Sequence, residues 1–259
     1  MIQYKKYFIV IFLSVLFGTQ VAAATEPIPI TLSGDMDKVI FDGKWTYLQE
    51  WKESSLNTLS YNDGTLIQLR TAHQNNFIYV LIDAVSLTHF NNGSDIAMVC
   101  FDQNNNKSAI PNANDYCFVA VLEGKSSFAL EGNSMLGMNG HFKKIPNPEG
   151  FIGIGGISDE NDRYSDVPHA SYEFRIPTDL VGRSDSYGFY LTVYDAHDNK
   201  FYSWPQYSDP INVFDIPSPH LWGNMISPDK SLPEFQLPIL TLIPAFLITL
   251  YVTRFRNKI

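Results

Sequence analysis

The sequence has few of the residues that usually mark an enzyme or a redox protein. It contains only two cysteines, Cys100 and Cys117, and no Cys-x-x-Cys-His sequence for covalent haem attachment. Gly-x-Ser-x-Gly, His-Glu-x-x-His and glycine-rich phosphate loops are also absent. The histidines are scattered and neither cysteine has a histidine close by, which argues against a blue-copper centre. We therefore expect a protein that is not an enzyme.

Basic residues are also scarce. The chain has 18 basic and 27 acidic residues, and five of the basic ones lie in the terminal segments 1–23 and 237–259. Residues 24–236 therefore hold 13 basic residues against all 27 acidic ones, a formal net charge of −14. A surface of this sign repels nucleic acid and anionic membrane surfaces, so neither is an expected partner.

The N-terminal segment 1–23 has the pattern of a signal peptide. Lys5 and Lys6 precede a short apolar run at 7–17, and small residues follow at 21–24. We expect cleavage before Ala24 or Thr25, with an uncleaved N-terminal anchor as the alternative. In both cases the domain that follows is exported.

The C-terminal segment 232–259 has the pattern of a membrane anchor or sorting signal. Residues 237–253 are apolar without a charge and precede three basic residues, an arrangement that stops in the bilayer with its basic end inside. Together with the Leu-Pro-Glu-Phe of 232–235, this segment resembles the Pro-Glu-Phe sorting signals of archaeal surface proteins. The resemblance implies cleavage by a sorting transpeptidase and attachment to a lipid, although Gln236 stands where one subtype has glycine. A retained single-pass hydrophobic helix is the alternative, and either anchor predicts a cell-surface location.

Residues 25–231 lack repeats and linkers, so we expect one extracellular domain. No window has a sustained helical period, whereas short aromatic and β-branched runs recur between Gly, Asn and Asp clusters. Several runs are apolar on both faces, as expected for stacked sheets. The sequence predicts an all-β, jelly-roll-like antiparallel β-sandwich with strands at 66–72, 77–85, 95–101, 116–123, 127–130, 151–157, 171–176, 187–195 and 201–204.

The two cysteines each lie inside an apolar run of an exported chain, where disulfides persist. We expect Cys100 and Cys117 to be bonded to each other if their strands lie side by side. Such a bridge is worth about 3 kcal/mol.

The order of several short motifs resembles family 9 carbohydrate-binding modules and their relatives. The resemblance implies the same sandwich, sugar binding and structural calcium, and some relatives are haem-binding electron-transfer domains. The matching pieces run from residue 39 to residue 222 and comprise Asp42-Gly43, Trp45, Glu50-Trp51, Tyr79-Val80, Phe101-Asp102, Asp115, Tyr172-Glu173-Phe174-Arg175-Ile176-Pro177, Gly188-Phe189, Tyr194-Asp195 and Trp204-Pro205.

An oxygen-rich loop is the strongest candidate for an ion site. Asp102, Asn104 and Asn106 alternate along the loop and Asp115 closes it, a pattern that can point hard oxygen ligands at a calcium ion. The alternative is an asparagine-rich turn that caps its own backbone. The resemblance favours the ion, and we expect calcium.

Sugar binding requires flat aromatic faces beside hydrogen-bonding side chains. Trp204 and Tyr207 are the best candidates, because Pro205 and Pro210 place both near a loop. Trp45, Trp51 and Trp222 are weaker candidates, since tryptophans in a sandwich usually fill the core.

The sequence therefore predicts a surface-anchored, non-catalytic, carbohydrate-binding-like module whose partners are glycan or envelope components. One alternative is a structural or interaction protein of the cell envelope without a small-molecule site. The other is a haem-binding electron-transfer domain, for which residues 133–141 gather two methionines and His141.

Overall fold

The computed structural model describes residues 26–124, 126–133, 141–206 and 215–228. The predicted signal peptide, Tyr207, the methionines of the 133–141 loop and the C-terminal segment all lie outside these ranges. Within them, no helix has the length and apolar character needed to cross a membrane.

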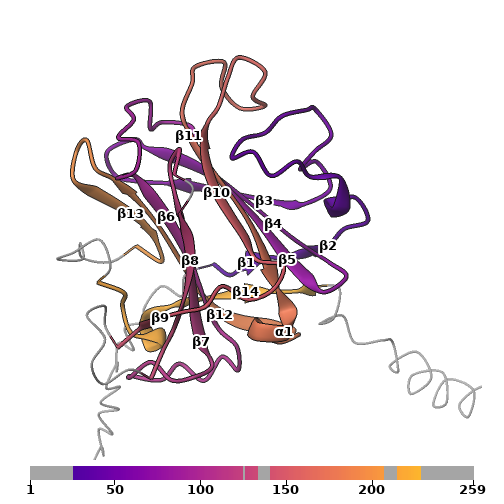
Figure 1. The fold of residues 1–259 in the computed structure, drawn as a ribbon, viewed down its shortest axis with the longest axis vertical. Coiled ribbons are helices and arrows are strands. Elements are labelled where there is room, and N and C mark those ends of the chain that lie inside the picture. The colour runs from indigo at the N-terminus through magenta and orange to yellow at the C-terminus, as the bar shows by residue number, and fades with distance from the viewer. Residues whose placement is uncertain (1–25, 125, 134–140, 207–214, 229–259) are drawn as a thin grey trace, which may run out of the picture.

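Two stacked β-sheets form the domain (Figure 1). One sheet has the order β1-β14-β12-β6-β7-β8-β9, with β13 also paired to β12, and the other has the order β10-β11-β5-β4-β2, with β3 also paired to β4. The strands are β1 (Ile28–Pro29), β2 (Thr31–Leu32), β3 (Ser55–Ser60), β4 (Leu66–Gln74), β5 (Phe77–Ala84), β6 (Ile96–Asp102), β7 (Asp115–Val121), β8 (Ser127–Glu131), β9 (Lys143–Ile145), β10 (Ile152–Ile157), β11 (Ala170–Pro177), β12 (Ser186–Asp195), β13 (Lys200–Trp204) and β14 (Gly223–Ile226). Within the described ranges, only short helical turns interrupt the strands: η1 (Met36–Lys38), α1 (Thr178–Val181) and η2 (Pro219–Leu221).

The main core lies between the two sheets. Alternate residues of β5, including Val80 and Ile82, pack in one cluster with Val99, Phe118 and Phe189 of the opposite sheet. This packing confirms the predicted β-rich sandwich, and each of the nine predicted strands is present. The prediction of a purely antiparallel sandwich is wrong in two places. The short strand β1 pairs in parallel with β14, and the short strand β2 pairs in parallel with β4.

Both outer faces are also covered, which explains why several strands are apolar on both sides. On the β6–β7 face, Trp222 and Phe142 cover the two cysteines. Cys100 and Cys117 lie directly opposite each other and are bonded, with their Cα atoms 4.0 Å apart, so the predicted disulfide is confirmed.

On the β4–β5–β11 face, the cover is the segment between β2 and β3, whose Trp45 and Trp51 pack against the sheet. The buried carboxylate of Glu173 on β11 attaches this segment. It accepts hydrogen bonds from the backbone N–H groups of Asp42 at 3.0 Å and Gly43 at 2.8 Å, and from Trp51 Nε1 at 3.0 Å. Burial holds the pKa of Glu173 well above its usual range.

Candidate functional site

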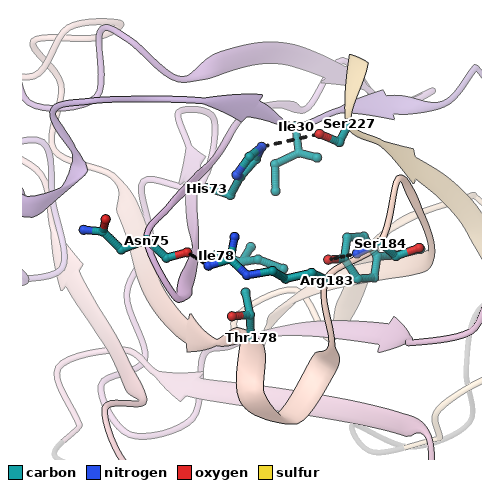
Figure 2. Close-up of a pocket in the computed structure, with 9 residues that line it drawn as sticks. Ile30, His73, Asn75, Ile78, Thr178, Arg183, Ser184 and Ser227 are labelled. Carbon is teal, nitrogen blue, oxygen red and sulfur yellow. Dashed lines mark hydrogen bonds between the residues drawn. The ribbon is translucent and has the colours of Figure 1, made fainter. Parts of the chain in front are cut away.

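One small pocket has too little space to bind a ligand. It lies between the start of β5 and the segment after α1 (Figure 2), and the space open to the centre of a water molecule is about 10 Å³, enough for a single water. Arg183 donates to the carbonyl of Asn75 and the side chain of Asn76, and Ser227 contacts His73 Nε2 at 3.4 Å. These polar groups therefore serve the fold.

A larger hollow lies where the edge strands β3 and β13 of the two sheets meet. It consists of two adjoining open pockets of about 350 and 340 Å³ that share Tyr61 and Gln206, and we call it the Tyr61–Gln206 groove. Its lining combines aromatic rings with charged and amide side chains. The lining residues are Thr58, Leu59, Ser60, Tyr61, Asn62, Asp63, Lys200, Phe201, Tyr202, Ser203, Trp204 and Gln206.

Contacts between the sheets fix the shape of this groove. The rings of Tyr61 and Tyr202 meet edge to face with their centroids 5.1 Å apart. The Tyr61 hydroxyl donates to the carbonyl of Ser203 at 3.3 Å, and Gln206 Nε2 donates to the carbonyl of Ser60 at 2.9 Å. The aromatic wall is therefore held in place by hydrogen bonds before any ligand arrives.

The rim of the groove carries a charged pair. Asp63 accepts hydrogen bonds from Thr65 N at 3.0 Å, Lys200 Nζ at 3.2 Å and the Tyr202 hydroxyl at 3.2 Å. These bonds, that from the Thr65 N–H foremost, lower the pKa of Asp63 to about 2. At neutral pH the groove thus presents an ionised acceptor and an ammonium donor side by side. Phe201 also lines the groove, but its ring points to the opposite face of β13 and packs against Tyr194, with the ring centroids 4.7 Å apart.

The residues predicted to stack on a sugar differ in how much of each is accessible in the structure. Trp204 is 8% exposed and packs against Phe189, with the ring centroids 6.0 Å apart, so only part of it lines the groove. Tyr207 lies outside the described residues. Trp45, Trp51 and Trp222 are buried in the outer clusters, as the core-filling alternative anticipated.

The strand β3 and the turn after it were missed from the sequence. β3 contains only two apolar side chains, Leu56 and Leu59, and so lacks a recognisable strand pattern. Without that strand, the turn residues Tyr61 and Asp63 could not be paired with Lys200 on β13. The Tyr-Asn-Asp-Gly sequence at 61–64 was the one available signal, since it is a strong turn sequence.

The predicted calcium loop begins and ends on one cross-strand pair. Asp102 and Asp115 face each other at the end of the β6–β7 ladder, and both are buried. Asp102 accepts hydrogen bonds from the backbone N–H groups of Asn106 and Lys107, while Asp115 Oδ2 accepts one from Asn112 N at 2.6 Å. The two carboxylates that the sequence placed at opposite ends of the loop therefore lie together.

Two oxygens in this loop are buried without a hydrogen-bond partner, Asp115 Oδ1 and Asn105 Oδ1. Burial, together with the nearby charge of Asp102, raises the pKa of Asp115 to about 7. Asn104 and Asn106 are exposed, and Asn106 Oδ1 accepts a bond from Ser108 N at 3.0 Å. The loop thus caps its own backbone, as the alternative predicted, and also leaves buried oxygens of the kind that calcium prefers.

Comparison with known proteins gives no family for this chain. No family model and no curated protein matches it. Its fold is similar to a family 9 carbohydrate-binding module from Caldicellulosiruptor kristjanssonii in complex with cellotriose, at 13% identity and a TM-score of 0.47 over 78% of this chain and 93% of that one. It is also similar to a family 9 carbohydrate-binding module from the same organism in complex with glucose, at 13% identity and a TM-score of 0.49 over 78% of this chain and 95% of that one. At these values the function has to be inferred from the residues of this chain.

Proposed function

We propose that the protein is an exported, non-catalytic module that binds glycan in the Tyr61–Gln206 groove. The observation that carries the proposal is the composition of the groove, in which a held aromatic wall adjoins a charged pair and an amide. Sugar recognition needs an apolar ring face and adjacent donors and acceptors for hydroxyl groups. The half-buried Tyr61 offers the ring, and Asp63, Lys200 and Gln206 offer the polar groups.

A calcium ion bound by Asp102 and Asp115 is part of this proposal. The buried and unpartnered oxygens of Asp115 and Asn105 support it, since calcium takes six to eight oxygen ligands from carboxylates, amides and waters. The ion would brace the end of the β6–β7 ladder. This role is separate from sugar binding, because the ladder and the groove are lined by different residues.

Attachment to a cell surface completes the proposal. The apolar run 237–253 with its basic end supports a membrane anchor, and the Leu-Pro-Glu-Phe at 232–235 supports processing by a sorting transpeptidase. A mass measurement on protein from the native membrane distinguishes a retained tail from a cleaved and lipid-linked one.

A glycan array followed by calorimetry on the full-length protein tests sugar binding, once with calcium and once with chelator. Cellotriose and glucose are included as defined ligands. The variant Lys200→Ala removes a charged donor from the groove, and we expect its affinity to fall about tenfold or more. Lys52→Ala, an exposed lysine on the segment between β2 and β3, is the matched control and should bind as the wild type does.

Absence of glycan binding in both conditions would overturn the module. If envelope proteins then co-purify with the chain, or it self-associates, the alternative of a structural or interaction protein of the envelope gains support.

A further inference from the structure

A second group of ionisable side chains lies on the outer face of the other sheet. Asp83 is on β5, His169 directly precedes β11, and Asp162 is in the connection from β10 to β11, at the top of Figure 1. Asp83 and His169 are both 0% exposed, and the Asp162 side chain is 1% exposed. One ligand atom from each lies within 4.8 Å of the others.

The imidazole of His169 is held in one orientation. Its Nδ1 lies 2.8 Å from the carbonyl oxygen of Val167, which can only accept, so Nδ1 carries a proton. Ser158 Oγ, which accepts from His169 N at 2.9 Å, lies beside the same ring nitrogen. The other nitrogen, Nε2, therefore points at Asp83 Oδ1 at 2.5 Å and Asp162 Oδ1 at 3.8 Å. A carbonyl that fixes the histidine tautomer in this way is the usual companion of a metal-ligating imidazole.

The carboxylates supply an independent observation. Asp83 Oδ2 and Asp162 Oδ2 are both buried without a hydrogen-bond partner. A third buried atom without a partner, Ser171 Oγ, belongs to the residue paired with Asp83 across β5 and β11. Buried polar atoms are nearly always satisfied, so three orphans around one histidine indicate a missing occupant. Two carboxylates and an imidazole whose oxygen and nitrogen atoms converge on one point favour a cation as that occupant.

We propose that Asp83, Asp162 and His169 bind a divalent transition-metal ion, for which zinc is best suited. Imidazole with carboxylate oxygens is a common zinc ligand set, and three protein ligands leave a fourth position for water or the Ser171 hydroxyl. Calcium is disfavoured here because it prefers oxygen ligands alone. The ion takes the place of the proton between His169 Nε2 and Asp83 Oδ1, and that proton passes to solvent.

The site lies beside an open pocket and has a structural purpose. Asp162 lines an open pocket of about 400 Å³ together with Trp45 and Asn161. The β10–β11 connection reaches the segment between β2 and β3 through the ion pair of Lys44 with Asp159. An ion at Asp162 therefore fixes this connection, and with it the outer cover, to the β5 strand beneath.

Zinc binding by the full-length protein tests the proposal. The protein is stripped with chelator and dialysed against zinc, and bound metal is measured by mass spectrometry, with the thermal midpoint recorded in parallel. We expect one tightly bound zinc per chain and a rise in the midpoint. Asp162→Asn keeps the oxygen that accepts from Tyr164 N and Ser165 N but removes a charged ligand, and it should weaken zinc binding by more than about tenfold.

Two controls separate this site from other acidic groups. Asp166→Asn changes an exposed carboxylate of the same connection and should leave zinc binding unchanged. Asp115→Asn changes the candidate calcium loop and should also leave it unchanged. Equal zinc binding by the wild type and Asp162→Asn would overturn the proposal, as would the absence of any bound zinc in the folded wild type. If Asp162→Asn unfolds, His169→Gln is measured in its place with the same expected loss.

Discussion

The substitution Asp115→Asn tests the reasoning about the calcium loop most directly. Asp115 is fully buried opposite Asp102, and its Oδ1 has no hydrogen-bond partner. Its Oδ2 accepts from Asn112 N, a bond that the amide oxygen of an asparagine keeps. The change therefore removes a buried charge with little change of shape. Without calcium, this removal should stabilise the protein at pH 8.

The pH dependence follows from the pKa values. The pKa of Asp115 is about 7 in the fold and about 3.9 in an unfolded chain. The folded state binds this proton more tightly, so the free energy of unfolding is highest at low pH and falls as the pH rises from about 4 to about 7. The full difference in the free energy of unfolding would be about 4 kcal/mol, and relaxation of the protein around the buried charge reduces it to about 2 kcal/mol.

Urea unfolding of both proteins at pH 5 and pH 8, with chelator and with calcium, measures these effects. With chelator, the wild type should lose about 1 kcal/mol relative to Asp115→Asn between the two pH values, because the rest of the change falls below pH 5. With calcium at pH 8, the order should reverse, because only the wild type has both carboxylates for the ion. Asp185→Asn, an exposed carboxylate, is the control and should follow the wild type throughout. A wild type that gains nothing from calcium relative to Asp115→Asn would refute the site.

Three further predictions concern the scaffold and are each measured by urea unfolding. Replacing Cys100 and Cys117 together by alanine should cost about 3 kcal/mol, and addition of reductant should then have no effect on the variant. Glu173→Gln should cost about 1–3 kcal/mol, because one of its two acceptor oxygens becomes a donor facing a buried N–H. Gly43→Ala should cost clearly more than Gly64→Ala, since both have a positive φ, near 90°, but only at Gly43 does a Cβ meet backbone, at 2.4 Å. Equal losses at the two glycines would contradict the packing described for Gly43.

The sequence was most informative where strands are buried on both sides. β5 and β6 read as unbroken apolar runs because one face meets the main core and the other an outer cluster. The disulfide could be predicted for the same reason, since Cys100 and Cys117 each lie within an apolar run. The shortest strands gave no comparable signal. β1, β2, β9 and β14 have two to four residues each, too few for a period, and form only because longer strands offer them an edge.

The candidate sites were predictable only where their residues are near in sequence. Asp102 and Asp115 were found because one loop joins them. The zinc candidates Asp83 and His169 are 86 positions apart and meet only through the pairing of β5 with β11. Asp162 was visible as one of several acidic residues in a loop, but nothing in the sequence separated it from its solvated neighbours Asp159 and Asp166. Its burial, which only the fold reveals, makes that distinction.

The resemblance to family 9 carbohydrate-binding modules rested partly on residues that the fold brings into contact. Asp42, Gly43 and Trp51 are all donors to the single carboxylate of Glu173. These residues therefore form a structural joint that fastens the outer segment to the sheet, and none of the four lines the Tyr61–Gln206 groove. Residues that maintain a joint can persist while the ligand changes, because fold and binding depend on different side chains. Under the proposed function, the choice of sugar therefore depends on Asp63, Lys200 and the residues around them.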